Sequence, residues 1–134
     1  MKKGNIIKEK SYSFSIRIVN LYKFLCDEKK EFVLSKQILR SGTSIGALTW
    51  ESEHAESKPD FIHKLAVALK EANETDYWLN ILKDTGYINN KMFQSIDKDC
   101  KEVIKILVTI IKSSKNKSLS YNNLIFNFSF FIFN

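Results

Sequence analysis

Two pairs of residues in this sequence have a spacing that could hold metal ions. Glu51 and His54 are separated by two residues, and so are Asp60 and His63. On a helix this spacing places both side chains on one face, as in the four-helix proteins that bind paired iron or manganese. Such a site also needs two further carboxylates at mid-bundle depth. Both pairs flank the turn at 57–59, and no other histidine is available, so we expect solvated polar residues there, with no metal and no cofactor.

Other patterns of catalytic residues do not occur in the sequence. It has no glycine-rich phosphate loop, no nucleophile elbow and no cysteine spacing typical of zinc sites. It also shows no activated nucleophile and no acid–base pair. We therefore expect a protein that is not an enzyme.

The sequence carries an excess of positive charge. Its formal net charge is +6 at pH 7 and its isoelectric point is about 9.3, which admits an anionic partner such as nucleic acid or a membrane surface. AT-rich coding, which favours Lys, Asn, Ile and Phe, would raise the basicity without a functional cause. The candidate nucleic-acid contacts are basic side chains on the predicted helices: Arg17, Lys23, Lys36, Arg40 and Lys64.

The two cysteines and the N-terminus indicate a cellular compartment. Cys26 and Cys100 lie far apart with no CxxC pattern, as is typical of reduced core thiols. The start of the sequence has no apolar run of a signal peptide, and no segment is apolar enough to span a bilayer. The prediction is a cytoplasmic protein with no membrane association.

These residues must be positioned by long helices. With 4 Gly and 1 Pro in 134 residues, the sequence favours one all-α domain over many short strands. Apolar residues at heptad spacing predict an antiparallel up-down four-helix bundle with helices near 11–28, 35–56, 58–84 and 90–115. The end signals are a Ser35 N-cap, a capping box from Ser57 to Asp60, a Gly86 stop and an Asn89 or Asn90 cap.

The second predicted helix contains two glycines one turn apart, Gly42 and Gly46. A glycine within a helix costs about 1 kcal/mol relative to alanine. Small side chains surround this pair, and Ile38, Ile45 and Leu48 supply apolar contacts beside it. We therefore expect another element to approach the backbone of this central packing helix closely.

The last predicted helix is apolar on more than one side. Phe93, Ile96 and Cys100 begin a heptad stripe that suffices for the core of one chain. A second stripe of Ile104, Val108 and Ile111 is then predicted to form a subunit interface, because a helix that is apolar nearly all round requires burial nearly all round. The alternative is a broad core-facing stripe with a few exposed aliphatic residues.

The end of the sequence differs in composition from the rest. Residues 118–134 are uncharged, aromatic and β-prone. The prediction divides the chain into a bundle domain, 1–117, and a non-helical aromatic tail, 118–134. Docking of the tail on a groove and addition of a short strand both remain open.

Three runs of residues resemble one bacterial family of four-helix bundles. They are FVLSKQILRSGTSIGA at 32–47, SKPDF at 57–61 and LKEANETDYWL at 69–79. This family includes the proteins encoded in intervening sequences of 23S ribosomal RNA genes, and the resemblance spans about residues 12–115. It implies a left-handed up-down bundle that forms a homopentamer.

The accessory proteins of diversity-generating retroelements are similar to this family. They bind RNA and a reverse transcriptase through a basic surface, so the resemblance implies a nucleoprotein partner. This chain departs from the family after the glycine pair, where Leu48, Thr49 and Trp50 precede Glu51 in place of Asn-Ile-Ala-Glu. Any role of the missing asparagine therefore does not carry over.

Two hypotheses follow for the function. The first is a basic, oligomeric, non-catalytic module that binds structured RNA or a nucleoprotein such as a reverse transcriptase complex. The second is a protein-interaction scaffold whose charge has no role in nucleic-acid binding. Retention on RNA that weakens with salt distinguishes the first from the second.

Overall fold

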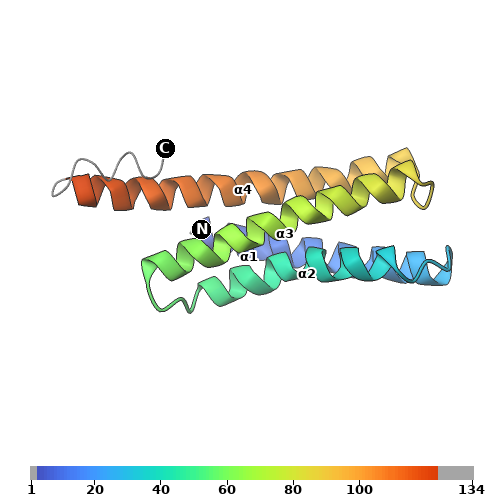
Figure 1. Cartoon of the computed structure of the whole chain (residues 1–134), viewed down its shortest axis with the longest axis horizontal. Coiled ribbons are helices and arrows are strands. Elements are labelled where there is room, and N and C mark those ends of the chain that lie inside the picture. The colour runs from blue at the N-terminus through green and yellow to red at the C-terminus, as the bar shows by residue number, and fades with distance from the viewer. Residues whose placement is uncertain (1–2, 124–134) are drawn as a thin grey trace.

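The computed structural model describes residues 3–123 as four α-helices and, within that range, no strand. They are α1 (Lys3–Asp27), α2 (Leu34–Ser52), α3 (Lys58–Asp84) and α4 (Asn90–Asn123). Successive helices reverse direction, so the α1–α2 and α3–α4 turns lie at one end of the bundle and the α2–α3 turn at the other (Figure 1). This confirms the predicted antiparallel up-down four-helix bundle.

The helix ends differ from the prediction in three places. Helix α1 begins at Lys3 rather than near residue 11, because Ile7 continues the buried stripe of Phe14 by one heptad. Helix α2 ends at Ser52 rather than 56. Helix α4 continues through Asn123, so the predicted non-helical tail begins within a helix, and its remainder, 124–134, lies outside the described residues. In Figure 1, α4 projects past the other helices at the end where α3 begins.

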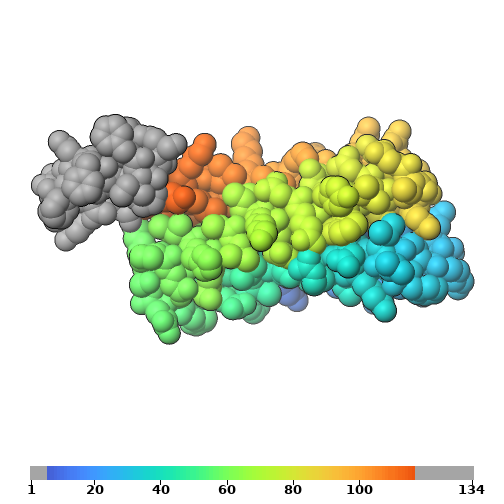
Figure 2. Space-filling view, in the orientation of Figure 1, coloured from blue at the N-terminus to red at the C-terminus, as the bar shows by residue number. Residues whose placement is uncertain are grey.

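Each helix packs against its neighbours in the sequence, and α4 returns to α1 through a smaller contact. On the face seen in Figure 2, α3 lies between α2 and α4. All four helices supply the apolar core. Its completely buried members are Ile18, Leu25, Ile38, Ile45, Ala68, Ala72, Leu79, Leu82, Cys100 and Leu107.

The glycines of α2 allow α1 to approach closely, as predicted. A Cβ atom at Gly42 would lie 2.8 Å from both γ carbons of Ile18. One at Gly46 would lie 3.0 Å from Ser15 Oγ and 3.3 Å from the carbonyl oxygen of Ser11. Real Cβ contacts are almost never as short as 2.8 Å, so the α1–α2 spacing requires glycine at position 42. At position 46 the contacts are tight, and a side chain there would require the neighbouring atoms of α1 to shift slightly.

Buried hydroxyl pairs join α2 to both of its neighbours. Thr49 Oγ1 lies 2.9 Å from Ser11 Oγ on α1, and Ser41 Oγ lies 3.0 Å from Thr75 Oγ1 on α3. All four residues are almost completely buried. A buried hydroxyl without a partner destabilises the fold, so these pairs favour one alignment of the helices.

Three of the four predicted end signals are correct. Ser57 Oγ accepts a hydrogen bond from Asp60 N, Asn89 Oδ1 accepts one from Met92 N, and Gly86 ends α3 with a φ of 84°. The Ser35 cap is wrong, because Ser35 already lies inside α2. Instead, the Glu31 carboxylate accepts hydrogen bonds from the amides of residues 33, 34 and 35, the shortest being 2.7 Å.

Candidate nucleic-acid interface

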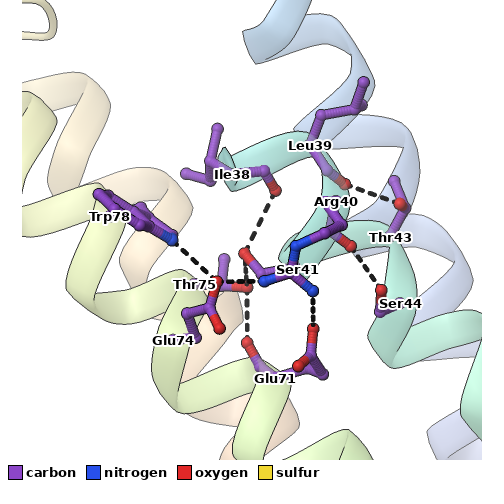
Figure 3. A network of polar contacts seen from close by, with 10 residues as sticks. All are labelled: Ile38, Leu39, Arg40, Ser41, Thr43, Ser44, Glu71, Glu74, Thr75 and Trp78. Carbon is purple, nitrogen blue, oxygen red and sulfur yellow. Dashed lines mark hydrogen bonds and ion pairs between the residues drawn. The ribbon is translucent and has the colours of Figure 1, made fainter. Parts of the chain in front are cut away.

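Arg40, one of the predicted phosphate contacts, is engaged within the chain. Its guanidinium on α2 forms ion pairs with Glu71, at 2.8 Å, and with Glu74, both on α3 (Figure 3). Trp78 Nε1 donates a hydrogen bond of 3.0 Å to the same Glu74 carboxylate. The hydrogen bonds from Trp78 and Arg40 lower the pKa of Glu74, which therefore stays ionised. Arg40 thus stabilises the α2–α3 contact directly above the buried Ser41–Thr75 pair.

Arg17 is engaged in the same way between α1 and α4. It donates to Asp99 Oδ2 at 2.7 Å and to the carbonyl and hydroxyl oxygens of Ser95, both at 3.0 Å. Lys64 lies 3.8 Å from Glu51 and 4.0 Å from Asp60. Arg17, Arg40 and Lys64 therefore have acidic partners within the chain, which the sequence prediction did not anticipate.

The remaining two candidates, Lys23 and Lys36, are exposed and free of intrachain partners in the described structure. Lys23 lies in the last turns of α1 and Lys36 in the first turn of α2, so they share the end of the bundle formed by the α1–α2 turn. Lys36 lies one turn before Arg40 on α2, but Lys64 lies near the start of α3, at the other end of the bundle. The structure thus does not gather the five predicted residues into one surface.

A row of lysines on α4 was missed by the sequence prediction. Lys91, Lys98, Lys105 and Lys112 recur at every seventh position along the helix. All four are exposed, and the described residues give none of them an ion-pair partner. At 1.5 Å per residue the steps measure about 10.5 Å, and the row extends about 32 Å along the outer side of α4. The period of seven in the sequence was the signal that could have identified it.

The carboxylates beside this row are neutralised by cations from α1 and from α4 itself. On the α1 side, Asp99 pairs with Arg17, and Glu102 pairs with Lys10 at 2.7 Å. On the α3 side, Lys101 lies 2.6 Å from Asp76 of α3 and 3.7 Å from Asp97. The lysine row therefore lies between two seams of ion pairs and keeps its positive charge.

The seam between α3 and α4 contains a second unpredicted feature, the carboxyl pair of Asp76 and Asp97. Burial and the neighbouring Asp76 raise the pKa of Asp97 to about 6. Burial opposes ionisation of Asp76 as well, but hydrogen bonds with Asp97 and Lys101 lower its pKa overall. Burial also raises the pKa of the adjacent Cys100 thiol to about 12, so this cysteine is not a nucleophile.

The residues with metal-ligand spacing lie at the surface. His54 and His63 are exposed, beside the turn between α2 and α3. No group of three or more potential ligands from His, Cys, Asp and Glu gathers anywhere in 3–123. Over the same residues, no helix is both long enough and apolar enough to cross a bilayer.

Two of the three predicted interface residues pack within their own chain. Ile111 is 8% exposed and belongs to the core, and Ile104 is half-buried against it. The premise that this stripe has no intrachain partner is therefore wrong for both, because α4 is covered more broadly by its neighbours than one heptad stripe requires. Val108 is half-buried and lies outside the core.

One exposed apolar patch lies on α1 and α2 instead. Tyr12 and Ile16 of α1 and Trp50 of α2 are each about half exposed, at 54%, 48% and 47%. The Tyr12 and Trp50 rings stack with centroids 5.8 Å apart, and Lys8 Nζ lies 4.4 Å above the Trp50 ring. A groove of about 300 Å³ lies beside the two rings and is also lined by Gly46.

Comparison with known proteins finds a matching family model and matching solved structures. The family model described as 23S rRNA-intervening sequence protein matches residues 3–109. A crystal structure of a protein with unknown function from the S23 ribosomal protein family of Bacteroides thetaiotaomicron is 59% identical, with a TM-score of 0.82. That match covers 83% of this chain and 99% of the other. No curated protein matches this chain.

Proposed function

This chain belongs to the 23S rRNA-intervening sequence protein family, and we propose that it binds structured RNA through the lysine row of α4, without catalysing a reaction. The observation that carries the proposal is the row itself, Lys91, Lys98, Lys105 and Lys112, which is exposed and has no acidic partner among the described residues. Lysines that contact phosphates displace condensed counterions, and this release provides most of the affinity that is independent of sequence.

The ion pairing of the other cations supports RNA binding through α4 rather than through the arginines. Arg17 and Arg40 are engaged by carboxylates, so binding phosphate through them would break existing ion pairs. The row lysines have no such pairs to break. Lys23 and Lys36, which are also free, would add contacts where an RNA extends past the α1–α2 turn. In the cell the RNA would be free or part of a nucleoprotein, such as a complex with a reverse transcriptase.

Salt-dependent retention on a structured RNA tests the proposal. The logarithm of the affinity should fall linearly with the logarithm of the salt concentration. Lys98→Gln/Lys105→Gln should weaken binding and reduce that slope by about one unit per lost contact. Lys23→Gln/Lys36→Gln removes the same charge elsewhere and should reduce the slope less.

Two results would count against RNA binding through α4. Equal effects of the two double variants would mean that net charge alone attracts the RNA. An unmutated protein that is not retained at low salt would favour the scaffold hypothesis.

We also propose that the protein is a homo-oligomer whose contact surface is the exposed apolar face of α1 and α2. Tyr12, Ile16 and Trp50 expose more apolar area than Val108, and exposed apolar patches often mark interfaces. Five copies are the number that the family resemblance implies. Light scattering should give an oligomer for the unmutated protein and a smaller folded species for Ile16→Glu.

A matched control for this proposal is Val33→Glu. Val33 is 70% exposed in the α1–α2 turn, so a charge there should leave the oligomer intact. A monomeric unmutated protein would refute the proposal. An Ile16→Glu variant that keeps the full size would place the contact elsewhere.

A further inference from the structure

We propose that the RNA contacted by α4 is double-helical and is recognised through its phosphates and riboses, without reading of the bases. This inference rests on the proposed function, because it concerns the same row of lysines. It follows from which side chains the surface of α4 presents and which it lacks.

Groups that stack on bases are lacking along the lysine row. Up to residue 116, the only aromatic side chain of α4 is Phe93, which is half-buried with Lys83 Nζ 4.2 Å above its ring. The exposed rings of Tyr12 and Trp50 belong to α1 and α2, and that of Tyr77 lies on α3, edge-on to Trp78. Stacking on aromatic rings contributes about 1–3 kcal/mol per base to the binding of single strands. The row therefore lacks the main source of affinity for unpaired bases.

A free guanidinium is lacking as well. Arginine is the side chain that most often reads guanine, through two parallel hydrogen bonds, and it also stacks on bases. The arginines of this sequence are Arg17 and Arg40, and both are held by carboxylates within the chain. Lysines acting as point charges remain, and they detect charge rather than sequence.

The row of lysines is also nearly straight. A helix presents its lysines along a nearly straight line about 32 Å long, with a drift of about 20° per heptad. A duplex is a stiff rod and carries about twice the charge per unit length of one of its strands. The straight row therefore meets more phosphate charge along a duplex than along a single strand.

Neutral residues beside the lysines could contact the ribose. The row face carries Gln94, Thr109 and Asn116, which are exposed at helical spacing from the lysines. Thr109 Oγ1 already donates to the carbonyl oxygen of Lys105 at 2.9 Å, so it would act as an acceptor. Amide and hydroxyl groups can both donate to and accept from a 2′-hydroxyl, which is the group that distinguishes RNA from DNA. Contacts across the shallow groove of an RNA duplex bring such residues close to the 2′-hydroxyls.

The test compares binding of the full chain to three probes of about 20 nucleotides per strand: an RNA duplex, oligouridine and a DNA duplex of the same sequence. At about 0.15 M salt we expect the RNA duplex to bind at least about tenfold more tightly than oligouridine. A second RNA duplex with scrambled sequence should bind within about twofold of the first. The DNA duplex should bind more weakly than the RNA duplex. The double variant Gln94→Ala/Asn116→Ala should reduce this difference in affinity.

The outcomes separate this inference from the proposed function. Binding of oligouridine as tight as that of the duplex, or a strong preference for one sequence, would overturn the inference while RNA binding stands. Equal binding of the DNA and RNA duplexes would overturn the ribose contact. If none of the probes binds, the proposed function itself fails. Lys98→Gln/Lys105→Gln should weaken both RNA duplexes by the same factor, since it removes only phosphate contacts.

Discussion

The side-chain hydroxyls of Ser41 and Thr75 lie 3.0 Å apart across the α2–α3 contact, and both residues are completely buried. Thr75 Oγ1 also lies 2.8 Å from the carbonyl oxygen of Glu71, one turn earlier on α3. This buried polar chain lies beside the ion pairs that Arg40 forms with Glu71 and Glu74 (Figure 3).

Thr75→Val should lower the free energy of unfolding by about 1–3 kcal/mol, because it keeps the side-chain volume but removes the closer partner of the buried Ser41 hydroxyl. The Ile38 carbonyl oxygen, at 3.5 Å, is then the remaining partner of Ser41. Ser41→Ala should cost less, since Thr75 keeps its contact with the Glu71 carbonyl. Denaturant titration measures both effects. The double variant should lose less than the sum of the single variants, and simple additivity would mean that the two hydroxyls do not interact.

Gly42→Ala should destabilise the bundle by about 1–3 kcal/mol through overpacking against Ile18, although alanine is the better helix former by about 1 kcal/mol. In an Ile18→Ala background the clashing γ carbons are absent. There the same substitution should be neutral or stabilising. Denaturant titration of the four proteins of this cycle gives the coupling. An equal cost of Gly42→Ala in both backgrounds would show that close approach of Ile18 is not the reason for the glycine.

Asp97 should make stability depend on pH in an unusual direction. Its pKa is about 6 in the folded chain against an ordinary value of 3.8, so the folded state holds a proton that the unfolded state releases between these values. The contribution is fully present below pH 3.8 and is lost as the pH rises through 6. Asp97→Asn mimics the protonated carboxyl, so its gain in stability over the unmutated protein should be largest near pH 7 and should vanish near pH 4. A gain that is the same at every pH would contradict the raised pKa.

Glu31→Ala should lower the free energy of unfolding by about 0.5–2 kcal/mol at pH 7, because three amides at the start of α2 lose their acceptor. Hydrogen bonds from these amides outweigh burial and lower the pKa of Glu31 below its ordinary value of 4.5. The contribution is therefore present above pH 4.5 and is lost as the pH falls through the folded pKa. Thermal unfolding between pH 7 and 3 should show the difference from the unmutated protein shrinking. Ser35→Ala, the change at the predicted cap, is the comparison.

Arg40→Gln should leave the salt dependence of RNA retention unchanged, since its charge is already compensated by Glu71 and Glu74. Its effect on the free energy of unfolding should be at most about 1 kcal/mol, because the guanidinium is half exposed and screened by water. Filter binding and denaturant titration measure the two effects. A reduced salt dependence of RNA retention would mean that Arg40 contacts the RNA.

Helix ends could be predicted from the sequence where the interaction that determines them is local. The Ser57 and Asn89 caps each involve a residue three positions away, and the Gly86 stop follows from its own backbone angle. The Glu31 cap was missed because a glutamate before a helix is a weaker signal than a serine at its start. The choice between them depends on the path of the turn, which includes Lys30 at a φ of 52°.

The candidate site was less predictable, because the partners of a basic residue are distant in the sequence. Glu71 and Glu74 lie 31 and 34 positions from Arg40, and Asp99 lies 82 positions from Arg17. The numbers of basic and acidic residues in a sequence do not show which basic side chains form ion pairs with carboxylates. The α4 lysines could have been found from their period of seven, but only the packing of α1 and α3 shows that the neighbouring carboxylates are occupied elsewhere.

The seams of ion pairs make the electrostatic potential of α4 a property of the assembled bundle. In a detached α4, Glu102 would stand one turn from both Lys98 and Lys105 and could neutralise either of them. In the bundle, Lys10 of α1 occupies that carboxylate and Arg17 occupies Asp99. A polyanion that binds the row must therefore bind more tightly when α1 is packed against α4 than when α1 has detached. By thermodynamic linkage, its binding would protect the α1–α4 contact, which is the smallest in the fold, against local opening.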